Sequence, residues 1–342
     1  MQPRVSVIVP IRNEEKYIEP CLKSLLAQTY PTTLYEILVV DGRSSDRSRE
    51  IVSGIEAGAS NVRCIDNPGA TAPAGMNVGI RNSTSDIIIR ADGHNFYPAD
   101  YIENCVKYLR ETGADNVGGP WRTVPTANTF GARLVAAILT SPFGVGDSSF
   151  RTTAKEGYVE TVPFGAFRRE LFDRIGLFNE KLVRNQDNEL NARIRQAGGS
   201  VYQTPALTTE YHPVASFGEL LKQTYRTSQW HVFSMRQNFH AMGLRHLAPA
   251  LLTATFLALG AASFFTPLAV LGLIALSAIY LLIGVAVSLS RSRQHGIAVV
   301  CILPVAFWLF HVSYGLGTLV GLKYLFAAPP TLPIRAGQPA DS

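Results

Sequence analysis

The first 100 residues alternate short apolar runs with stretches of mixed polarity. Each run is a few residues long and stops at a proline or a polar residue, as a buried strand does. We interpret four runs as strands: 5–10, 36–40, 62–65 and 87–89. After the first run, apolar residues recur three and four positions apart, which predicts an amphipathic helix within residues 14–28. Strands that alternate with helices predict an α/β domain with a mainly parallel sheet and helices on both faces.

The segment from 161 to 199 continues this pattern. An apolar stretch at 161–167, interrupted by a glycine, precedes a helix that opens near Arg168. A second helix follows Asn185 and ends at a Gly-Gly pair. We expect the Asn185 side chain to cap this helix, which places Asp187 in its first turn.

Polar periodicity disappears in the last third of the chain. Residues 247–290 contain no Asp, Glu, Lys, Arg or His, and His311 is the single such residue in 297–322. Because about 20 apolar residues cross a bilayer as a helix, we predict three membrane spans: 247–265, 268–289 and 297–322. Basic residues lie before the first span and in the loop after the second, at 291–295, so the positive-inside rule places both on the cytoplasmic side.

Residues 216–246 are amphipathic and basic, with Lys222, Arg226, Arg236 and Arg245 among several aromatic residues. This pattern favours interfacial helices on the cytoplasmic membrane surface, where cations meet anionic lipid; an ordinary packed surface helix is the alternative. The predicted organisation therefore has four parts, a cytosolic domain, interfacial helices, a membrane region and a proline-containing disordered tail: 1–215, 216–246, 247–325 and 326–342.

The composition agrees with a soluble part joined to a membrane part. Hydrophobic residues make up 47% and charged residues 17%, against roughly 25% charged in soluble domains. The four cysteines form no closely spaced pair, which argues against a metal knuckle or redox motif and favours a reduced compartment. The first residues lead directly into a strand, so no signal peptide is expected. The net charge of +5 is modest, and no cluster of basic and aromatic residues argues for a nucleic-acid partner.

Two of the predicted strands deliver an acid and a glycine at their carboxyl ends, as Asp41-Gly42 and Asp92-Gly93-His94. Asp-Gly is also a common turn dipeptide, but two such pairs at one edge of a parallel sheet favour a ligand site. No glycine-rich phosphate loop of either standard type is present. We therefore hypothesise that Asp92 and His94 hold a divalent cation, Mg²⁺ or Mn²⁺, and that the cation holds a diphosphate.

Two further acids have candidate roles. Asp41 suits a neutral heterocycle, because a carboxylate accepts a hydrogen bond from a ring N–H, and Gly42 lets a ligand approach the backbone. Asp187 suits a base that takes a proton from an acceptor hydroxyl. Its alternative is an acid that stabilises a helix start, worth at most about 1 kcal/mol. In either role we expect the helix dipole to lower the pKa of Asp187.

These motifs together resemble the family-2 glycosyltransferases, which have the Rossmann-like GT-A fold, and within them the ExoA-type membrane enzymes of bacterial exopolysaccharide assembly. The resemblance covers roughly residues 5–230. It rests on five blocks, of which the last two match the acceptor-side segment and the catalytic-base motif: 5–15, 39–46, 90–94, 164–168 and 185–187.

The resemblance implies an inverting, metal-dependent transfer from a nucleotide-diphosphate sugar, usually a UDP-sugar, to a polyprenyl-linked or saccharide acceptor at the plasma membrane. Asp187 would be the base, and Asp92 and His94 would hold the metal. Donor contacts would come from Pro10, Arg12, Asn13, Glu14, Asp41, Gly42, Ser44 and Asp92. Acceptor-side contacts would come from Gly165, Ala166, Gln186, Gln223, Arg226 and Trp230.

Three positions depart from the family pattern. His94 stands where the metal motif usually ends in Asp, and Gln186 stands where an acid usually precedes the base. Gln223 and Arg226 fit a Gln-x-x-Arg-Trp element whose tryptophan is displaced to Trp230. The displacement argues against a processive polysaccharide synthase, which is the first alternative function. A non-catalytic membrane scaffold that binds nucleotide sugars is the second, and the presence of all three acids argues against it.

Overall fold

The computed structural model describes residues 2–243, 246–291 and 296–330. They form two compact units. The sheet unit comprises residues 2–122 and 153–210, and the helical unit comprises residues 123–152 and 211–330. Arg245, most of the basic loop at 291–295 and residues 331–342 of the predicted tail lie outside the described residues.

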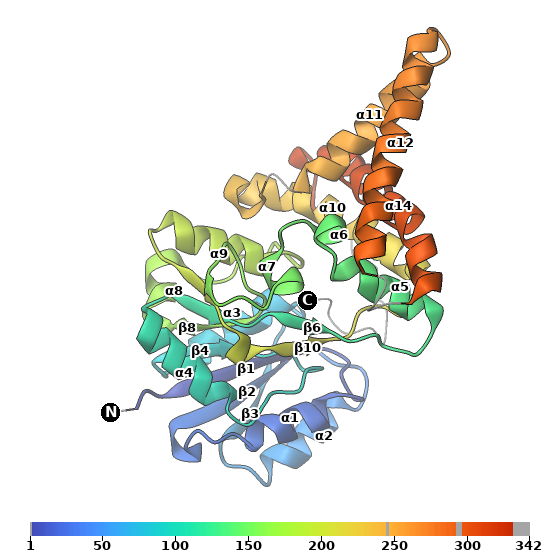
Figure 1. The fold of residues 1–342 in the computed structure, drawn as a ribbon. Coiled ribbons are helices and arrows are strands. Elements are labelled where there is room, and N and C mark those ends of the chain that lie inside the picture. Colours follow the sequence, from blue (N-terminus) through green and yellow to red (C-terminus); the bar gives the residue numbers. More distant parts are fainter. Residues whose placement is uncertain (1, 244–245, 292–295, 331–342) are drawn as a thin grey trace. The chain divides into compact units, whose positions relative to one another are not determined.

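The sheet unit is built on an eight-stranded sheet of mainly parallel strands (Figure 1). Its order is β3 (Val62–Asp66), β2 (Tyr35–Asp41), β1 (Val5–Ile11), β4 (Ile87–Arg90), β8 (Gly165–Arg168), β5 (Asn116–Gly118), β9 (Val201–Gln203) and β7 (Gly157–Tyr158). Strand β8 is antiparallel to both β4 and β5, and β7 is antiparallel to β9. Strands β6 (Trp121–Thr123) and β10 (Thr209–Tyr211) form a separate pair.

Alternate residues of the central strands enter two apolar cores, one on each face of the sheet. Val7 and Val9 of β1 pack on the side of three helices: α1 (Ile18–Leu26), α2 (Ser48–Glu56) and α4 (Tyr101–Thr112). Ile8 packs on the opposite side with three others: α3 (Ala72–Asn82), α8 (Arg169–Ile175) and α9 (Gln186–Gln196). A strand buried on both faces reads as one continuous apolar run. The predicted α/β fold with helices on both faces is confirmed.

Helix α3 has no counterpart in the sequence prediction. Its segment is rich in Gly, Ala and Pro, which usually indicate a loop. Pro73 lies in the first turn, where its missing N–H is harmless, and the Thr71 hydroxyl accepts from Ala74 N. A Cβ on Gly79 would lie 2.4 Å from Ile8 Cγ2. The glycine therefore lets α3 pack closely on β1.

The helical unit contains long apolar helices in the region of the predicted spans. They are α11 (Ala248–Ala262), α12 (Pro267–Ser290) and α14 (Ile297–Gly321), and Pro304 lies inside α14. By length and composition, α12 and the continuous segment Ile297–Leu325 could each cross a membrane, whereas α11 has 15 residues. The number of spans therefore stays a prediction.

Helix α10 (Phe217–Gln237) occupies most of the predicted interfacial segment and packs along α14. Ser313 Oγ donates to Leu221 O at 2.8 Å between the two helices. Three shorter helices also belong to this unit: α5 (Phe130–Leu139), α6 (Pro142–Val145) and α7 (Ser149–Thr152). Packing thus assigns residues 123–152 to the helical unit, and the predicted domain boundary at 215 is left as a prediction.

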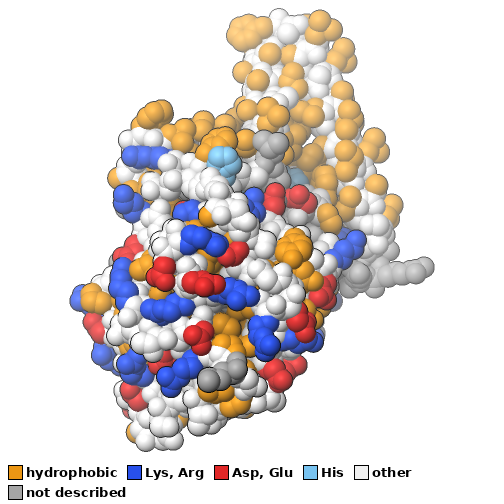
Figure 2. Space-filling model, turned by 90° about the vertical axis from the view of Figure 1, so that its left-hand side faces the viewer, with side chains coloured by type: hydrophobic (Ala, Val, Ile, Leu, Met, Phe, Trp, Pro, Cys, Tyr) orange, Lys and Arg blue, Asp and Glu red, His pale blue; other side chains and the backbone are white. Residues whose placement is uncertain are grey.

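The two units differ in the surface that they expose. Figure 2 shows charged side chains spread over the sheet unit and hydrophobic side chains over the long helices. On α12, Leu271 and Leu282 are 61% and 69% exposed. Isolated exposed apolar residues are ordinary, but a continuous exposed apolar surface indicates a membrane or protein interface.

Candidate active site

The loops after β1 and β2 are tied together by hydrogen bonds. Asn13 donates its backbone N–H to Ser44 Oγ at 2.9 Å and accepts from Ser45 N at 2.8 Å through its side chain. Glu14 N donates to Ser48 Oγ at 2.7 Å. Asn13 has φ +60°, a conformation that asparagine tolerates better than most residues. Of the predicted donor contacts, Asn13, Glu14 and Ser44 therefore belong to one braced pair of loops.

Asp41 is the last residue of β2, and its carboxylate is completely buried. Ser44 Oγ donates to Oδ1 at 2.5 Å, and Arg49 Nη1 lies 3.6 Å from Oδ2. Asp41 thus fixes the loop that follows it. Its contact with a heterocycle stays a prediction.

The remaining donor-side positions brace the same edge. Gly42 N donates to Ile11 O at 2.8 Å, which continues the pairing of β1 and β2 by one residue. Arg12 Nη1 donates to Ala70 O at 3.1 Å. The Pro10 ring packs next to Gly75 of α3. These contacts position the loops. The contact of Pro10, Arg12 and Gly42 with a donor stays a prediction.

Asp92 and His94 follow β4 at this edge. Asp92 Oδ1 lies 3.2 Å from Arg90 Nη2, and His94 Nδ1 lies 3.2 Å from Glu14 Oε1. Burial alone would lower the pKa of His94, but the hydrogen bond with Glu14 and the charge of Asp92 outweigh it and raise that pKa. Burial raises the pKa of Glu14, and its contact with His94 opposes this shift. Glu14 therefore orients the imidazole ring.

Two buried carboxylate oxygens at this edge make no hydrogen bond within the described residues. They are Asp92 Oδ2 and Glu14 Oε2. A buried acceptor without a partner costs about 1–3 kcal/mol, and carboxylate oxygens are the ligands that Mg²⁺ and Mn²⁺ prefer. No group of three or more His, Cys, Asp and Glu that could hold a metal ion occurs in the part of the chain that the structure describes. The residues thus fit a cation whose other ligands come from a bound molecule and from water.

Arg90 brings Asp187 and Asp92 together. It is the last residue of β4 and is 1% exposed. Its Nη1 pairs with Asp187 Oδ1, while Nη2 donates to Asp92 Oδ1. The guanidinium carbon lies 5.5 Å from the centre of the Phe164 ring. The Arg90 guanidinium therefore bridges Asp187, the predicted base, and Asp92, a predicted metal ligand.

Two expectations for the start of α9 are wrong. Asn185 occupies the cap position with φ +63°, but its side chain makes no capping hydrogen bond, because a left-handed residue does not have the extended backbone of a capping residue. The pKa of Asp187 is raised rather than lowered. Burial is the main cause, the charge of Asp92 adds to it, and Arg90 opposes it only in part. Desolvation therefore outweighs the helix dipole here.

The three acceptor-side positions of the sheet unit are buried. Gly165 has φ +116°, and a Cβ there would lie 2.2 Å from Asn116 Oδ1, so no other residue fits. Ala166 pairs with Ile89 and Val117 inside the sheet. Gln186 is also buried. Their contact with an acceptor stays a prediction.

Gln223, Arg226 and Trp230 lie on α10 in the helical unit. Trp230 is buried against Phe233, with ring centres 5.8 Å apart, whereas Arg226 is exposed. Their role on the acceptor side also stays a prediction.

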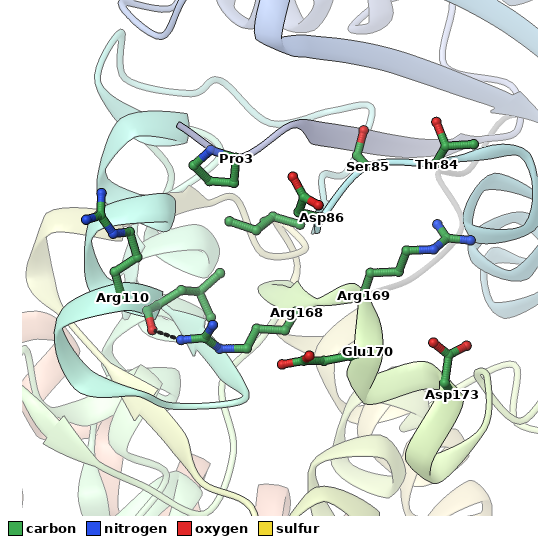
Figure 3. A pocket seen from close by; sticks show the side chains of 11 residues that line it. Pro3, Thr84, Ser85, Asp86, Arg110, Arg168, Arg169, Glu170 and Asp173 are labelled. Atoms are coloured by element: carbon green, nitrogen blue, oxygen red, sulfur yellow. Dashed lines mark hydrogen bonds between the residues drawn. The ribbon is translucent and has the colours of Figure 1, made fainter. Parts of the chain in front are cut away.

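A pocket of about 480 Å³ lies in the sheet unit, and Figure 3 shows the side chains that line it. It is lined by residues before or at the amino ends of β1 and β4, such as Pro3 and Asp86, and by Arg110, Arg168 and Asp173. Arg168 Nη2 donates to Leu109 O at 2.6 Å. The pocket therefore lies at the opposite edge of the sheet from Asp92.

Comparison with known proteins identifies the family of the chain. The model of glycosyl transferase family 2 matches residues 6–176, which is half of the chain. The chain belongs to this family. As a family-2 glycosyltransferase it uses a nucleotide-sugar donor, and the predicted GT-A fold is confirmed.

Curated relatives of this family-2 glycosyltransferase act in glycan assembly. The succinoglycan biosynthesis protein ExoA of Rhizobium meliloti is 29% identical over 71% of this chain and 73% of its own length. A dolichyl N-acetyl-α-D-glucosaminyl phosphate 3-β-D-2,3-diacetamido-2,3-dideoxy-β-D-glucuronosyltransferase of Methanococcus voltae is 28% identical over 64% of this chain and 70% of its own length. The resemblance to ExoA that the motifs predicted is confirmed.

Solved structures share the fold of this family-2 glycosyltransferase. A mannosyltransferase from Pyrobaculum calidifontis, in complex with GDP-Man and Mn²⁺, has a TM-score of 0.60 at 21% identity and covers 92% of this chain and 87% of its own. TarS 1–349 of S. aureus has a TM-score of 0.51 at 16% identity and covers 93% and 91%.

Sequence reasoning missed Arg90 as part of this family-2 site. The signal was present, because an arginine directly follows three apolar strand residues. Arginine is almost never fully buried unless it is paired, so its position predicts acidic partners. The pairing of Glu14 with His94 was missed as well, since the two residues are far apart in the sequence.

Proposed function

We propose that this family-2 glycosyltransferase moves one sugar, with inversion, from a nucleotide-diphosphate sugar to an acceptor hydroxyl in a single displacement. The bridge that Arg90 forms between Asp187 and Asp92 is the observation that supports it best. The bridge holds a candidate base beside a candidate diphosphate site. By resemblance to the family, the preferred donor is a UDP-sugar.

Asp187 is the base of this reaction. Its carboxylate takes the proton of the acceptor hydroxyl while the hydroxyl oxygen forms a bond to the anomeric carbon. The bond from that carbon to the donor oxygen breaks, and the nucleoside diphosphate leaves with the electron pair. The raised pKa of Asp187 favours proton transfer, because the driving force increases as the pKa of a base approaches the working pH.

Asp92 is the main protein ligand of a divalent cation, through the carboxylate oxygen that makes no hydrogen bond among the described side chains. Glu14 orients the ring of His94 beside it, as carboxylates commonly orient metal-binding histidines. When bound, a divalent cation offsets the charge of the departing diphosphate. The Mn²⁺ in the Pyrobaculum calidifontis mannosyltransferase supports this assignment by analogy of fold.

The loops after β1 and β2 bind the nucleotide. Asp41 and Ser44 form the wall that contacts the heterocycle. Asn13 ties the loops after β1 and β2 together, and Arg12 ties the first of them to Ala70 after β3. Because these side chains already brace one another, the site is preorganised before the donor arrives.

The acceptor is carried by a polyprenyl-type lipid, with a free saccharide as the alternative. The two long apolar helices anchor the enzyme in the plasma membrane, with the sheet unit in the cytoplasm by the positive-inside rule. The name of the Methanococcus voltae relative, which specifies a dolichyl-phosphate-linked sugar, supports a lipid-linked acceptor. Gly165 and Gln186 are proposed to belong to the acceptor side of the sheet unit.

The test incubates membranes that carry the protein with a panel of nucleotide sugars and polyprenyl-phosphate-linked acceptors, and identifies the products by mass spectrometry. Product length separates a single addition from processive synthesis, and NMR of the new linkage determines inversion. We expect Asp187→Asn to lower kcat by about 10²–10⁴-fold and to leave binding of UDP with MnCl₂ intact.

Asp173→Asn is the matched control for this substitution. Asp173 is an exposed acid of the same unit and lines the pocket at the opposite edge of the sheet. It should keep full turnover. Wild-type turnover by Asp187→Asn would remove Asp187 as the base, and product with the anomeric configuration of the donor would contradict the single displacement.

A further inference from the structure

Arg90 is a cation in the core of the sheet unit. It follows Ile89 in a strand whose side chains are all buried. Removing a guanidinium from water costs several kcal/mol even when it is paired, and apolar side chains of similar volume are often at least as stable in such places. Stability alone therefore does not explain an arginine here.

The contacts of Arg90 divide between a helix and a loop. One terminal nitrogen pairs with Asp187 in the first turn of α9, and the other lies 3.2 Å from Asp92, which follows β4. The two terminal nitrogens of a guanidinium are held in one plane at a fixed spacing. The two carboxylates are consequently held at a defined separation.

The Arg90 guanidinium lies over the ring of Phe164. The guanidinium carbon lies 5.5 Å from the ring centre, within the range of a cation–π contact. Phe164 has φ +61° and precedes Gly165, which has φ +116°. The backbone of Phe164 also forms a hydrogen bond with Asp187. Phe164 therefore contacts both partners of the ion pair.

We infer that Arg90 is a positioning residue that sets the place of the base Asp187 relative to the donor-binding carboxylate Asp92. The inference rests on the proposed function, since it acts through Asp187 as the base. Arg90 touches no reacting atom. It holds the base carboxylate where the acceptor hydroxyl meets the donor, so its loss lowers turnover more than it lowers donor affinity.

Arg90→Lys is the sharpest test, because lysine keeps the buried charge but cannot bridge two carboxylates in one plane. We expect kcat to fall about 30–100-fold, since a misplacement of 1 Å at a reacting group can cost about 10²-fold. The donor KM and calorimetric binding of UDP with MnCl₂ should change less than about threefold. Arg174→Lys is the matched control, because Arg174 of α8 pairs with a carboxylate outside the site, that of Asp115.

A double-mutant cycle separates positioning from a structural role. With a radiolabelled donor, Arg90→Lys should cost less than about threefold when it is added to Asp187→Asn, because the base that it positions is already gone. The same loss in both backgrounds would indicate a structural role and overturn the inference. So would wild-type kcat in Arg90→Lys alone. Full turnover by Asp187→Asn would instead overturn the proposed function.

A second substitution keeps the inference testable if Arg90→Lys does not fold, which gel filtration and thermal unfolding would show. Phe164→Leu removes the ring next to the guanidinium and changes no charge. We expect kcat to fall about 3–10-fold with unchanged donor KM, which converts to ~0.6–1.4 kcal/mol and lies within the range of a cation–π contact. An unchanged kcat, or an equal fall in the Asp187→Asn background, would contradict the positioning role.

Discussion

The sheet unit and the helical unit differ in the kinds of side chain that they bury and expose. The sheet unit buries charged side chains and pairs them, as Arg90 is paired with Asp92 and Asp187. The helical unit exposes large apolar side chains such as Leu271 and Leu282. In water, each Å² of exposed apolar surface costs about 25 cal/mol, whereas lipid removes that cost. The difference agrees with the proposed membrane anchor, in which the long helices face lipid and the sheet unit faces water.

The contrast separates two functions within one chain. Changes to paired charges should alter catalysis and leave membrane attachment intact, whereas changes to exposed apolar residues should do the reverse.

The largest effect is expected for Leu271→Arg combined with Leu282→Arg on α12. An arginine at the centre of a membrane helix costs about 2.5–3.5 kcal/mol. When membranes are extracted with alkaline carbonate, the double variant should therefore appear in the soluble fraction, whereas the wild type should stay in the membrane pellet. Tyr158→Arg, at a residue of the sheet unit that is 64% exposed, should leave attachment unchanged. If the double variant resisted extraction as wild type does, the apolar helices would not be the anchor.

Removal of divalent cations by chelation tests catalysis by the sheet unit. EDTA should lower turnover at least about 10²-fold, because a cation supplies several kcal/mol of charge stabilisation at the leaving group. Added MnCl₂ should restore turnover, and the membrane-bound fraction should not change. Full activity in metal-free buffer would overturn the proposed cation.

The pH dependence should report Asp187. A base must be unprotonated, so kcat/KM falls about tenfold per pH unit below its pKa. Because burial raises that pKa, this acid limb should lie above the ordinary aspartate value of about 3.9. The limb should be absent from the residual rate of Asp187→Asn. A limb at or below the ordinary value would show that Arg90, and not burial, dominates.

The smallest effect is expected for Ser44→Ala. It removes one hydrogen bond to Asp41 and one acceptor for Asn13 N, worth about 1 kcal/mol. The donor KM should rise about fivefold at constant kcat. Ser53→Ala, at an exposed serine on α2, is the matched control. A fall in kcat with unchanged KM would argue that this loop contacts the acceptor and not the nucleotide.

The features that were predictable are those written into local patterns. Apolar runs gave the central strands and the long helices, and parallel strands align their carboxyl ends, so Asp41 and Asp92 could be placed at one edge. Helix α3 was missed because its glycines and proline usually indicate a loop, and here they serve close packing. Local patterns do not contain the information needed for packing.

The bridge at Arg90 depends on contacts between distant parts of the chain. Strand β8 inserts antiparallel beside β4, and α9 packs on the face of the sheet where the Phe167 side chain of β8 lies. This packing brings Asp187 to Arg90. The direction of the pKa shift of Asp187 has the same origin. The helix start was predictable, but the burial that outweighs its dipole was not.

The interleaving of the two units has a consequence for synthesis. Helix α5 is completed early in translation, yet its apolar residues Leu134 and Ile138 pack with Leu303 and Phe307 of α14. At roughly 5–20 residues per second, the nascent α5 waits on the order of ten seconds for its partner. Until then the apolar face of α5 lacks the α14 side chains that cover it in the folded protein. A soluble fragment cut at residue 215 would keep α5 permanently uncovered, and it should aggregate unless α5 is replaced by a polar linker.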